Sequence, residues 1–156
     1  CASTAKAQWE EMQMNIAQIL NAKGRAVSTA RPDATLSEII GKLAEKKIGA
    51  IVIVGDNGKV AGIVSERDII RRLGVAGAAA LDEPVSSAMT ATVITCHESS
   101  TLEEMMEVMT QGRFRHVPVI EEGSLVGIVS IGDVVKHHVA EVEMEVTAMR
   151  DYFATG

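Results

Sequence analysis

Apolar residues follow different spacings along the first half of the chain, and each spacing predicts one kind of element. In residues 36–43 they return at steps of three and four, which is typical of a helix with one buried face. Residues 50–54 form an apolar run of strand length, and a second strand is predicted over residues 59–64. Between them, Asp-Asn-Gly at 56–58 favours a tight turn, because Asn and Gly tolerate positive φ angles. These residues therefore predict a β-hairpin after the helix.

The same unit extends on both sides of the hairpin. Residues 27–29 predict a short strand before the helix. After Ser65, apolar residues again hold helical spacing at Ile69, Ile70 and Leu73, which predicts a second helix. The order of elements is therefore strand, helix, strand, strand, helix.

This unit occurs twice in the chain. The segment GIVSERD at 62–68 returns as GIVSIGD at 127–133, and one residue has been lost from the second hairpin. Because two units this small cannot bury their apolar faces alone, we expect an α+β fold in which two β-α-β-β-α repeats pack as a pseudo-two-fold pair. The predicted domains are an N-terminal helix at 1–24, repeats at 25–83 and 84–140, and a C-terminal helix extension at 141–156.

Two apolar helices are predicted outside the repeats. The first covers residues 6–22 and ends at Gly24; it has no counterpart in the second half, and its apolar stripe consists of Trp9, Met12, Ile16 and Ile19. The second runs on to about residue 153, with the alternating steps of a coiled-coil seam at Val135, Val139, Val142, Val146, Met149 and Phe153. Each helix either packs on its own chain or pairs two subunits. Unless the two bury each other within one subunit, they favour a homodimer.

Charge and composition exclude several classes of function. The formal net charge is −6, and no run of Lys or Arg provides the basic face that a nucleic-acid backbone requires. We find no apolar run long enough to span a membrane, no signal-peptide pattern at the N-terminus, and no metal or disulfide spacing between Cys1 and Cys96. We therefore expect a cytoplasmic protein that binds neither nucleic acid nor membrane. Because the chain opens with Cys rather than Met, we expect that residues upstream have been removed.

The repeated serine and aspartate allow two interpretations. Ser65 with Asp68, and Ser130 with Asp133, have the spacing of a capping box, which stabilises a helix by about 1 kcal/mol. Spacing alone favours this interpretation. In the functional interpretation, the serine lies at a helix N-terminus that binds phosphate, and the aspartate accepts hydrogen bonds from the vicinal hydroxyls of a ribose. Such a pair suits a nucleoside monophosphate.

Together, these features resemble a tandem cystathionine-β-synthase (CBS) domain pair, of the small stand-alone bacterial type. The resemblance rests on the doubled unit, on GIVSERD and GIVSIGD after the hairpins, and on RFRHVPVI at 113–120. It covers about residues 24–139. It implies that adenine nucleotides bind in two clefts between the repeats, and that pairs associate into a disc of four repeats.

Carried over residue by residue, the resemblance implies two unequal sites. The first would consist of Ser65, Arg67, Asp68, Thr95 and Ser100. The second would consist of Thr29, Ala34, Ala50, Ile51, Arg115, His116, Ser130 and Asp133. Arg115 and His116 would face the phosphate of the second site, whereas the matching positions of the first repeat are Gly49 and Ala50. We therefore expect the Asp133 site to be the better occupied.

Other polar residues give weaker candidates. His137 and Glu141 have a helical spacing that suits a metal, but a solvated helix face is the favoured interpretation. The neighbours Cys96 and His97 would point to opposite faces of a strand, which argues against a nucleophile pair. The sequence also contains no phosphate loop, no recognisable pair of catalytic carboxylates and no metal-ligand set.

We therefore expect a non-catalytic regulatory module that binds an adenine nucleotide and requires no metal. AMP is the first choice of ligand, with ADP, ATP, NAD(H) or S-adenosylmethionine as the alternatives. Binding would change the conformation or the partner of the module, whose protein target the sequence does not identify. The competing hypothesis is a structural interaction module with empty clefts, and a nucleotide-processing enzyme is a remote third.

Overall fold

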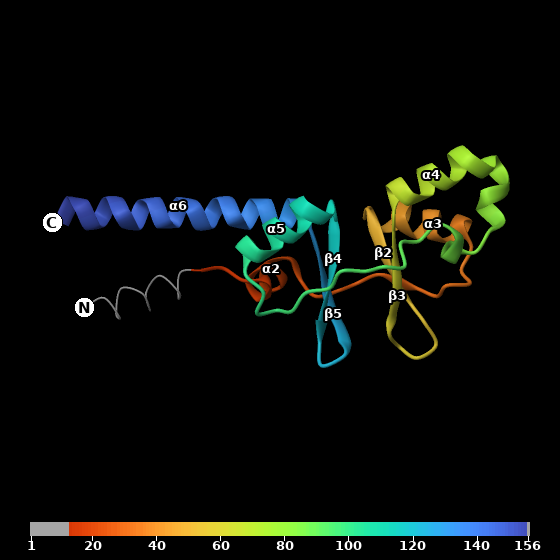
Figure 1. Ribbon diagram of the computed structural model, residues 1–156, viewed down its shortest axis with the longest axis horizontal. Coiled ribbons are helices and arrows are strands. Elements are labelled where there is room, and N and C mark those ends of the chain that lie inside the picture. The colour runs from red at the N-terminus through yellow and green to blue at the C-terminus, as the bar shows by residue number, and fades with distance from the viewer. Residues whose placement is uncertain (1–12, 156) are drawn as a thin grey trace. The chain divides into compact units, whose positions relative to one another are not determined.

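The computed structural model describes residues 13–155, so Trp9 and Met12 of the predicted N-terminal stripe lie outside the described residues (Figure 1). The chain forms two compact units. The repeat-1 unit consists of Ala26–Thr95 and Ile120–Gly127. Of the described residues, the repeat-2 unit consists of 13–25, 96–119 and 128–155. The predicted domain boundaries before residues 25, 84 and 141 stay a prediction.

The repeat-1 unit contains a three-stranded sheet in the order β1–β2–β3. Strand β1 (Thr29–Ala30) runs parallel to β2 (Ala50–Val54), which pairs antiparallel with β3 (Val60–Ser65). Helices α3 (Leu36–Lys46) and α4 (Glu66–Ala76) and the 3₁₀ helices η1 (Gly77–Asp82) and η2 (Val85–Ser87) complete the unit. Its buried core is Ala30, Leu36, Ile39, Leu43, Ile51, Ile53, Val64, Ile69, Ala80 and Val85. The predicted order of strand, helix, strand, strand, helix is confirmed.

The second repeat has fewer regular strands than the first. Its elements are α5 (Leu102–Gly112), β4 (His116–Glu121), β5 (Ser124–Ser130) and α6 (Ile131–Thr155), and β4 and β5 pair as a two-stranded sheet. In place of a first strand, Cys96 forms an isolated parallel bridge with Val119, and the Cys96 N–H donates to the Pro118 carbonyl at 3.0 Å. The fold class is nevertheless confirmed, because both repeats contain the hairpin with its flanking helices.

Two segments of the chain, at residues 16–17 and 85–86, are held by matching backbone hydrogen bonds. The Ile16 N–H donates to the Ser100 carbonyl at 3.0 Å, and the matching bond runs from the Val85 N–H to the Ala34 carbonyl at 2.7 Å. One residue later the pattern recurs, from Ala17 to Glu98 and from Ser86 to Pro32. The start of α2 (Ile16–Lys23) therefore has η2 as its counterpart. The prediction that the N-terminal helix has no counterpart in the second half is therefore wrong. The sequence does not reveal the match, because backbone hydrogen bonds do not require similar side chains.

Helix α2 ends where its sequence predicts, but it begins only at Ile16. Residues 13–15 of the predicted helix are not helical, because Asn15 is an extended N-cap whose side chain accepts the Gln18 N–H. Gly24 adopts a φ of 98°, which few other residues tolerate, and its N–H caps the Leu20 carbonyl. Both α2 and α5 lie against α6 in the repeat-2 unit (Figure 1). Ile16, Ile19 and Leu20 are fully buried, so the described part of the N-terminal stripe packs on its own chain.

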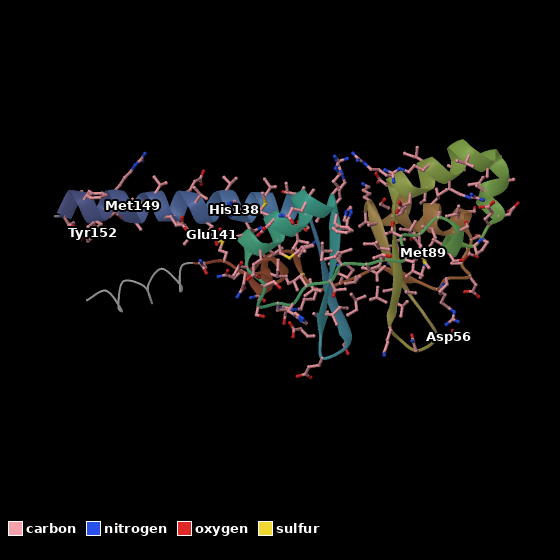
Figure 2. The ribbon with its side chains drawn as sticks, in the orientation of Figure 1. Asp56, Met89, His138, Glu141, Met149 and Tyr152 are labelled. Carbon is pink, nitrogen blue, oxygen red and sulfur yellow. The ribbon has the colours of Figure 1, made fainter. Side chains whose placement is uncertain are left out.

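Helix α6 extends over 25 residues and exposes the apolar seam that the sequence predicts. All six seam residues are at least 41% exposed: Val135, Val139, Val142, Val146, Met149 and Phe153. The buried residues of this helix are instead Val134 and Glu141. No described residue therefore buries the seam, and Figure 2 shows side chains along α6, with Met149 and Tyr152 labelled near its end.

Candidate functional site

The serine and aspartate of each repeat form a capping box at a helix N-terminus. On α4, the Ser65 N–H donates to Asp68 Oδ2 at 2.9 Å, and the Asp68 N–H donates to Ser65 Oγ at 3.3 Å. On α6, the Ser130 N–H donates to Asp133 Oδ2 at 2.9 Å, and the Asp133 N–H donates to Ser130 Oγ at 3.1 Å. The capping interpretation is confirmed for both copies.

The capping boxes leave Oδ1 of each aspartate available. Both boxes use Oδ2 of the aspartate, and no described residue donates to Oδ1 of Asp68 or Asp133. Both side chains are half-buried rather than sealed in the core. An ionised carboxylate accepts about four hydrogen bonds. The aspartates can therefore cap a helix and accept hydroxyls from a ligand at the same time.

In each repeat, the residue before the hairpin is hydrogen-bonded to the first residue of the helix that carries the aspartate. The Ile131 N–H donates to the Arg115 carbonyl at 2.8 Å, and the matching bond runs from the Glu66 N–H to the Gly49 carbonyl at 3.1 Å. The predicted correspondence between Arg115 and Gly49 thus has a structural basis. Arg115 is exposed and His116, the first residue of β4, is half-buried. The repeat-2 unit therefore gathers Arg115, His116, Ser130 and Asp133 around the start of α6.

Sequence reasoning missed Lys23, which lies on the Asp133 carboxylate. Lys23 Nζ donates to Asp133 Oδ2 at 2.7 Å and to the Ile128 carbonyl at 3.0 Å. Burial disfavours the charged form of Asp133, but the bonds from Lys23 and Ser130 outweigh it and lower the pKa of this carboxyl below its usual value. Since 110 residues separate Lys23 from Asp133, no local spacing relates them. The only sequence signal was a lysine at the end of a helix, before Gly24.

The Asp68 copy has no such cation. Of the described residues, only Ser65 donates to Asp68. The carbonyl of Ile63, which matches Ile128, accepts the backbone N–H of Thr90 at 2.8 Å instead of a lysine. Arg67 is exposed in the first turn of α4, and Thr95 is also exposed. The two copies therefore share a cap but differ in charge.

The repeat-1 unit also contains an open cavity of about 590 Å³. Its lining is Thr29, Ala30, Arg31, Asp33, Ala34, Glu38, Lys42, Val54 and Gly55. Thr29 and Ala34, both predicted for the second site, are among these residues, and Lys42 Nζ donates to the Thr29 carbonyl at 3.1 Å. Ala50 and Ile51 are buried at the start of β2, so their side chains belong to the core.

The predicted site residues fall into two groups. Ser65, Arg67, Asp68, Thr95, Thr29, Ala34, Ala50 and Ile51 belong to the repeat-1 unit. Ser100, Arg115, His116, Ser130 and Asp133 belong to the repeat-2 unit. Within the repeat-2 unit, Arg115, His116, Ser130 and Asp133 lie together at the start of α6, whereas Ser100 accepts the Ile16 and His97 N–H groups. Within the repeat-1 unit, Ser65, Arg67 and Asp68 lie at the start of α4, and Thr29 and Ala34 line the cavity. That each site combines residues of both units stays a prediction.

The weaker candidates have other partners. His137 Nδ1 lies 2.9 Å from the Asp133 carbonyl, and Glu141 Oε2 accepts the Met14 N–H at 2.5 Å. Within residues 13–155, no three His, Cys, Asp or Glu side chains gather as a metal site would require. Across the same residues, no helix combines the length and the apolar character needed to cross a membrane.

The family model of the CBS domain matches the chain twice, at residues 24–75 and at residues 85–140. The chain belongs to the CBS domain family. Each match includes one helix–hairpin–helix unit with its capped serine and aspartate. The CBS domain pair that the sequence predicts is therefore confirmed.

Solved structures of other CBS domain proteins resemble this CBS domain pair. ATU1752 from Agrobacterium tumefaciens is 49% identical with a TM-score of 0.76, and the match covers 80% of this chain and 93% of that one. PAE2072 from Pyrobaculum aerophilum, complexed with AMP, is 28% identical with a TM-score of 0.69, over 77% and 89% of the two chains. The CBS domain pair of protein MJ0100, in complex with 5′-methylthioadenosine and S-adenosyl-L-methionine, is 25% identical with a TM-score of 0.73, over 83% and 98%.

Proposed function

We propose that this CBS domain pair is a non-catalytic regulatory module that binds an adenine nucleotide, AMP first of all, at the Asp133 site. The observation that carries the proposal is the start of α6, where a capped carboxylate keeps Oδ1 available beside Ser130, Arg115 and His116. The carboxylate suits the vicinal hydroxyls of a ribose. The helix N-terminus and the two basic residues suit a phosphate.

The ligands of the relatives support an adenosine-containing ligand. AMP in PAE2072, and 5′-methylthioadenosine and S-adenosyl-L-methionine in MJ0100, all contain adenosine. An aspartate that accepts ribose hydroxyls fits this shared part. ADP, ATP and NAD(H) contain it too and remain the alternative ligands for this chain.

Binding would act through the equilibrium between arrangements of the two repeats. A ligand that contacts both repeats favours the arrangement for which it has the higher affinity, and the change in population is the signal. In this proposal the module is a cytoplasmic homodimer, and a protein target reads its state. The exposed seam of α6 supports the homodimer, because an apolar stripe of this length is unfavourable in water.

The first prediction concerns the two aspartates. Asp133→Asn should abolish the stabilisation by AMP, whereas Asp68→Asn should retain most of it. Among the described residues, only the Asp133 copy has a lysine on its carboxylate, with Arg115 and His116 where β4 begins. Thermal unfolding with and without AMP, in protein freed of bound ligand, measures this. An AMP concentration one hundred times the dissociation constant stabilises a one-site protein by about 2.7 kcal/mol.

Three results would contradict the proposal. Equal losses in both variants would refute the preference for Asp133. An absence of stabilisation by AMP, ADP, ATP and NADH would favour a structural interaction module, which the exposed α6 seam independently supports. Turnover of a nucleotide by the wild-type protein, with a loss of turnover in Asp133→Asn, would identify an enzyme.

A further inference from the structure

Lys23 lies on the proposed ligand-binding carboxylate, although it belongs to neither repeat motif. We propose that Lys23 is a specificity-determining residue of the Asp133 site, which selects adenine ligands that carry a phosphate over neutral nucleosides. This inference rests on the proposed nucleotide site and adds the chemical class of ligand that the site prefers.

The first argument is the position of the ammonium group. Lys23 Nζ lies 2.7 Å from Asp133 Oδ2 and is also bonded to the Ile128 carbonyl on β5, the strand that leads into α6. The Lys23 side chain is 35% exposed and that of Asp133 is 26% exposed, so a ligand can reach both. Because an ammonium has three N–H donors and two are used here, the third is available to a ligand oxygen.

The second argument is the competition that a ribose meets at this carboxylate. Oδ2 already accepts two hydrogen bonds, from Ser130 N–H and Lys23 Nζ. The available Oδ1 can accept one ribose hydroxyl. The vicinal second hydroxyl reaches Oδ2 only by replacing the charge-assisted bond from Lys23 with a weaker neutral one, which leaves the ammonium without its anion. A neutral nucleoside offers the ammonium no substitute. A phosphate provides the ammonium with a new anionic partner. Lys23 therefore weakens the binding of nucleosides and strengthens the binding of nucleotides.

The third argument is the contrast with the Asp68 copy. In the register that matches Thr29 with Thr95, the position of Lys23 is occupied by Met89. The Ile63 carbonyl there accepts the Thr90 backbone N–H, and among the residues described only Ser65 donates to Asp68. A ligand at Asp68 therefore displaces no ammonium. Discrimination between nucleoside and nucleotide should belong to the Asp133 site.

The test compares the affinities for AMP and adenosine by calorimetry, in an Asp68→Asn background so that the Asp133 site is measured alone. Lys23→Met introduces the residue found at the matching position of the Asp68 copy, Met89. It should weaken AMP binding about tenfold or more and leave adenosine binding equal or tighter. Lys23→Arg retains the charge and should retain most of the preference for AMP. Lys136→Met removes the same charge from an exposed position on α6 and should behave as the background protein does.

The outcomes separate this inference from the proposed function. If the background protein binds AMP and Lys23→Met has the same ratio of AMP to adenosine affinity, Lys23 selects nothing and the proposed function stands. If the wild-type protein binds neither ligand, both proposals are overturned. Circular dichroism checks the fold of each variant. If Lys23→Met does not fold, Lys23→Gln, which keeps a hydrogen-bond donor without the charge, must show the same loss of preference or the inference fails.

Discussion

The Asp133 carboxylate closes a helix cap and holds an ammonium at the same time. Its Oδ2 accepts the Ser130 N–H and Lys23 Nζ, and these bonds outweigh the cost of burial. The local half of this arrangement follows from the sequence, because a serine three residues before an aspartate predicts a capping box. The distant half does not, because only the folded chain brings the end of α2 to the start of α6.

The lowered pKa of Asp133 gives the pair a defined pH dependence. A carboxyl whose pKa is lower in the folded state contributes stability above its ordinary pKa of 3.8, and loses that stability as the pH falls through the folded value. Wild-type protein should therefore be more stable than Lys23→Met near neutral pH, and the difference should shrink below about pH 4. Urea unfolding of both proteins across this range measures it. A difference that stays constant down to the lowest pH would contradict this account.

At the scale of elements, α6 is the helix whose environment the sequence predicts least well. Its alternating apolar steps indicate a helix with one apolar stripe, and the structure contains that helix. The periodicity of apolar residues does not show what a stripe packs against. In this structure, the described part of the chain packs on another face of α6 and leaves the apolar stripe exposed. That face buries Glu141, which is only 7% exposed and receives the Met14 N–H. A carboxylate in a buried position has no signal in an apolar pattern.

Glu141 should stabilise the contact between α6 and the segment before α2. Its Oε2 accepts the Met14 N–H, and its Oε1 lies 3.3 Å from His138 Nδ1 on the preceding turn; Figure 2 labels His138 and Glu141. Glu141→Ala should lower the free energy of unfolding by about 1–3 kcal/mol, because it leaves a donor without its acceptor. Glu143→Ala, at an exposed position of α6, should change it by less than about 0.5 kcal/mol. Equal effects of the two changes in urea unfolding would show that the Glu141 contacts add nothing.

At the scale of the molecule, the chain consists of two copies of one unit that have diverged in charge. Hairpins, helix faces and caps follow from short-range spacing, and the sequence predicts them in both copies. The doubled motif is also sufficient to indicate the family. The docking of α2 and η2 could not be predicted, because matching backbone hydrogen bonds make both contacts with unrelated side chains. The sequence predicts only part of the difference in charge between the two sites. It indicates the contribution of Arg115 and His116 but not that of Lys23.

The seam of α6 should join two copies of the chain. Its six apolar residues are exposed along one helix at the steps of a coiled coil, and two such helices bury each other's stripes. Val146→Asp places a charge in the seam, and association should weaken by about a hundredfold or more, since burial of an unpaired charge costs several kcal/mol. Thr147→Asp adds the same charge to the exposed residue beside the seam and should leave association unchanged. Sedimentation equilibrium of the three proteins measures the association. Dimers of equal strength in all three proteins would place the subunit contact outside the seam.

If Val146→Asp is monomeric and still binds AMP, recognition of the ligand does not require assembly of two subunits.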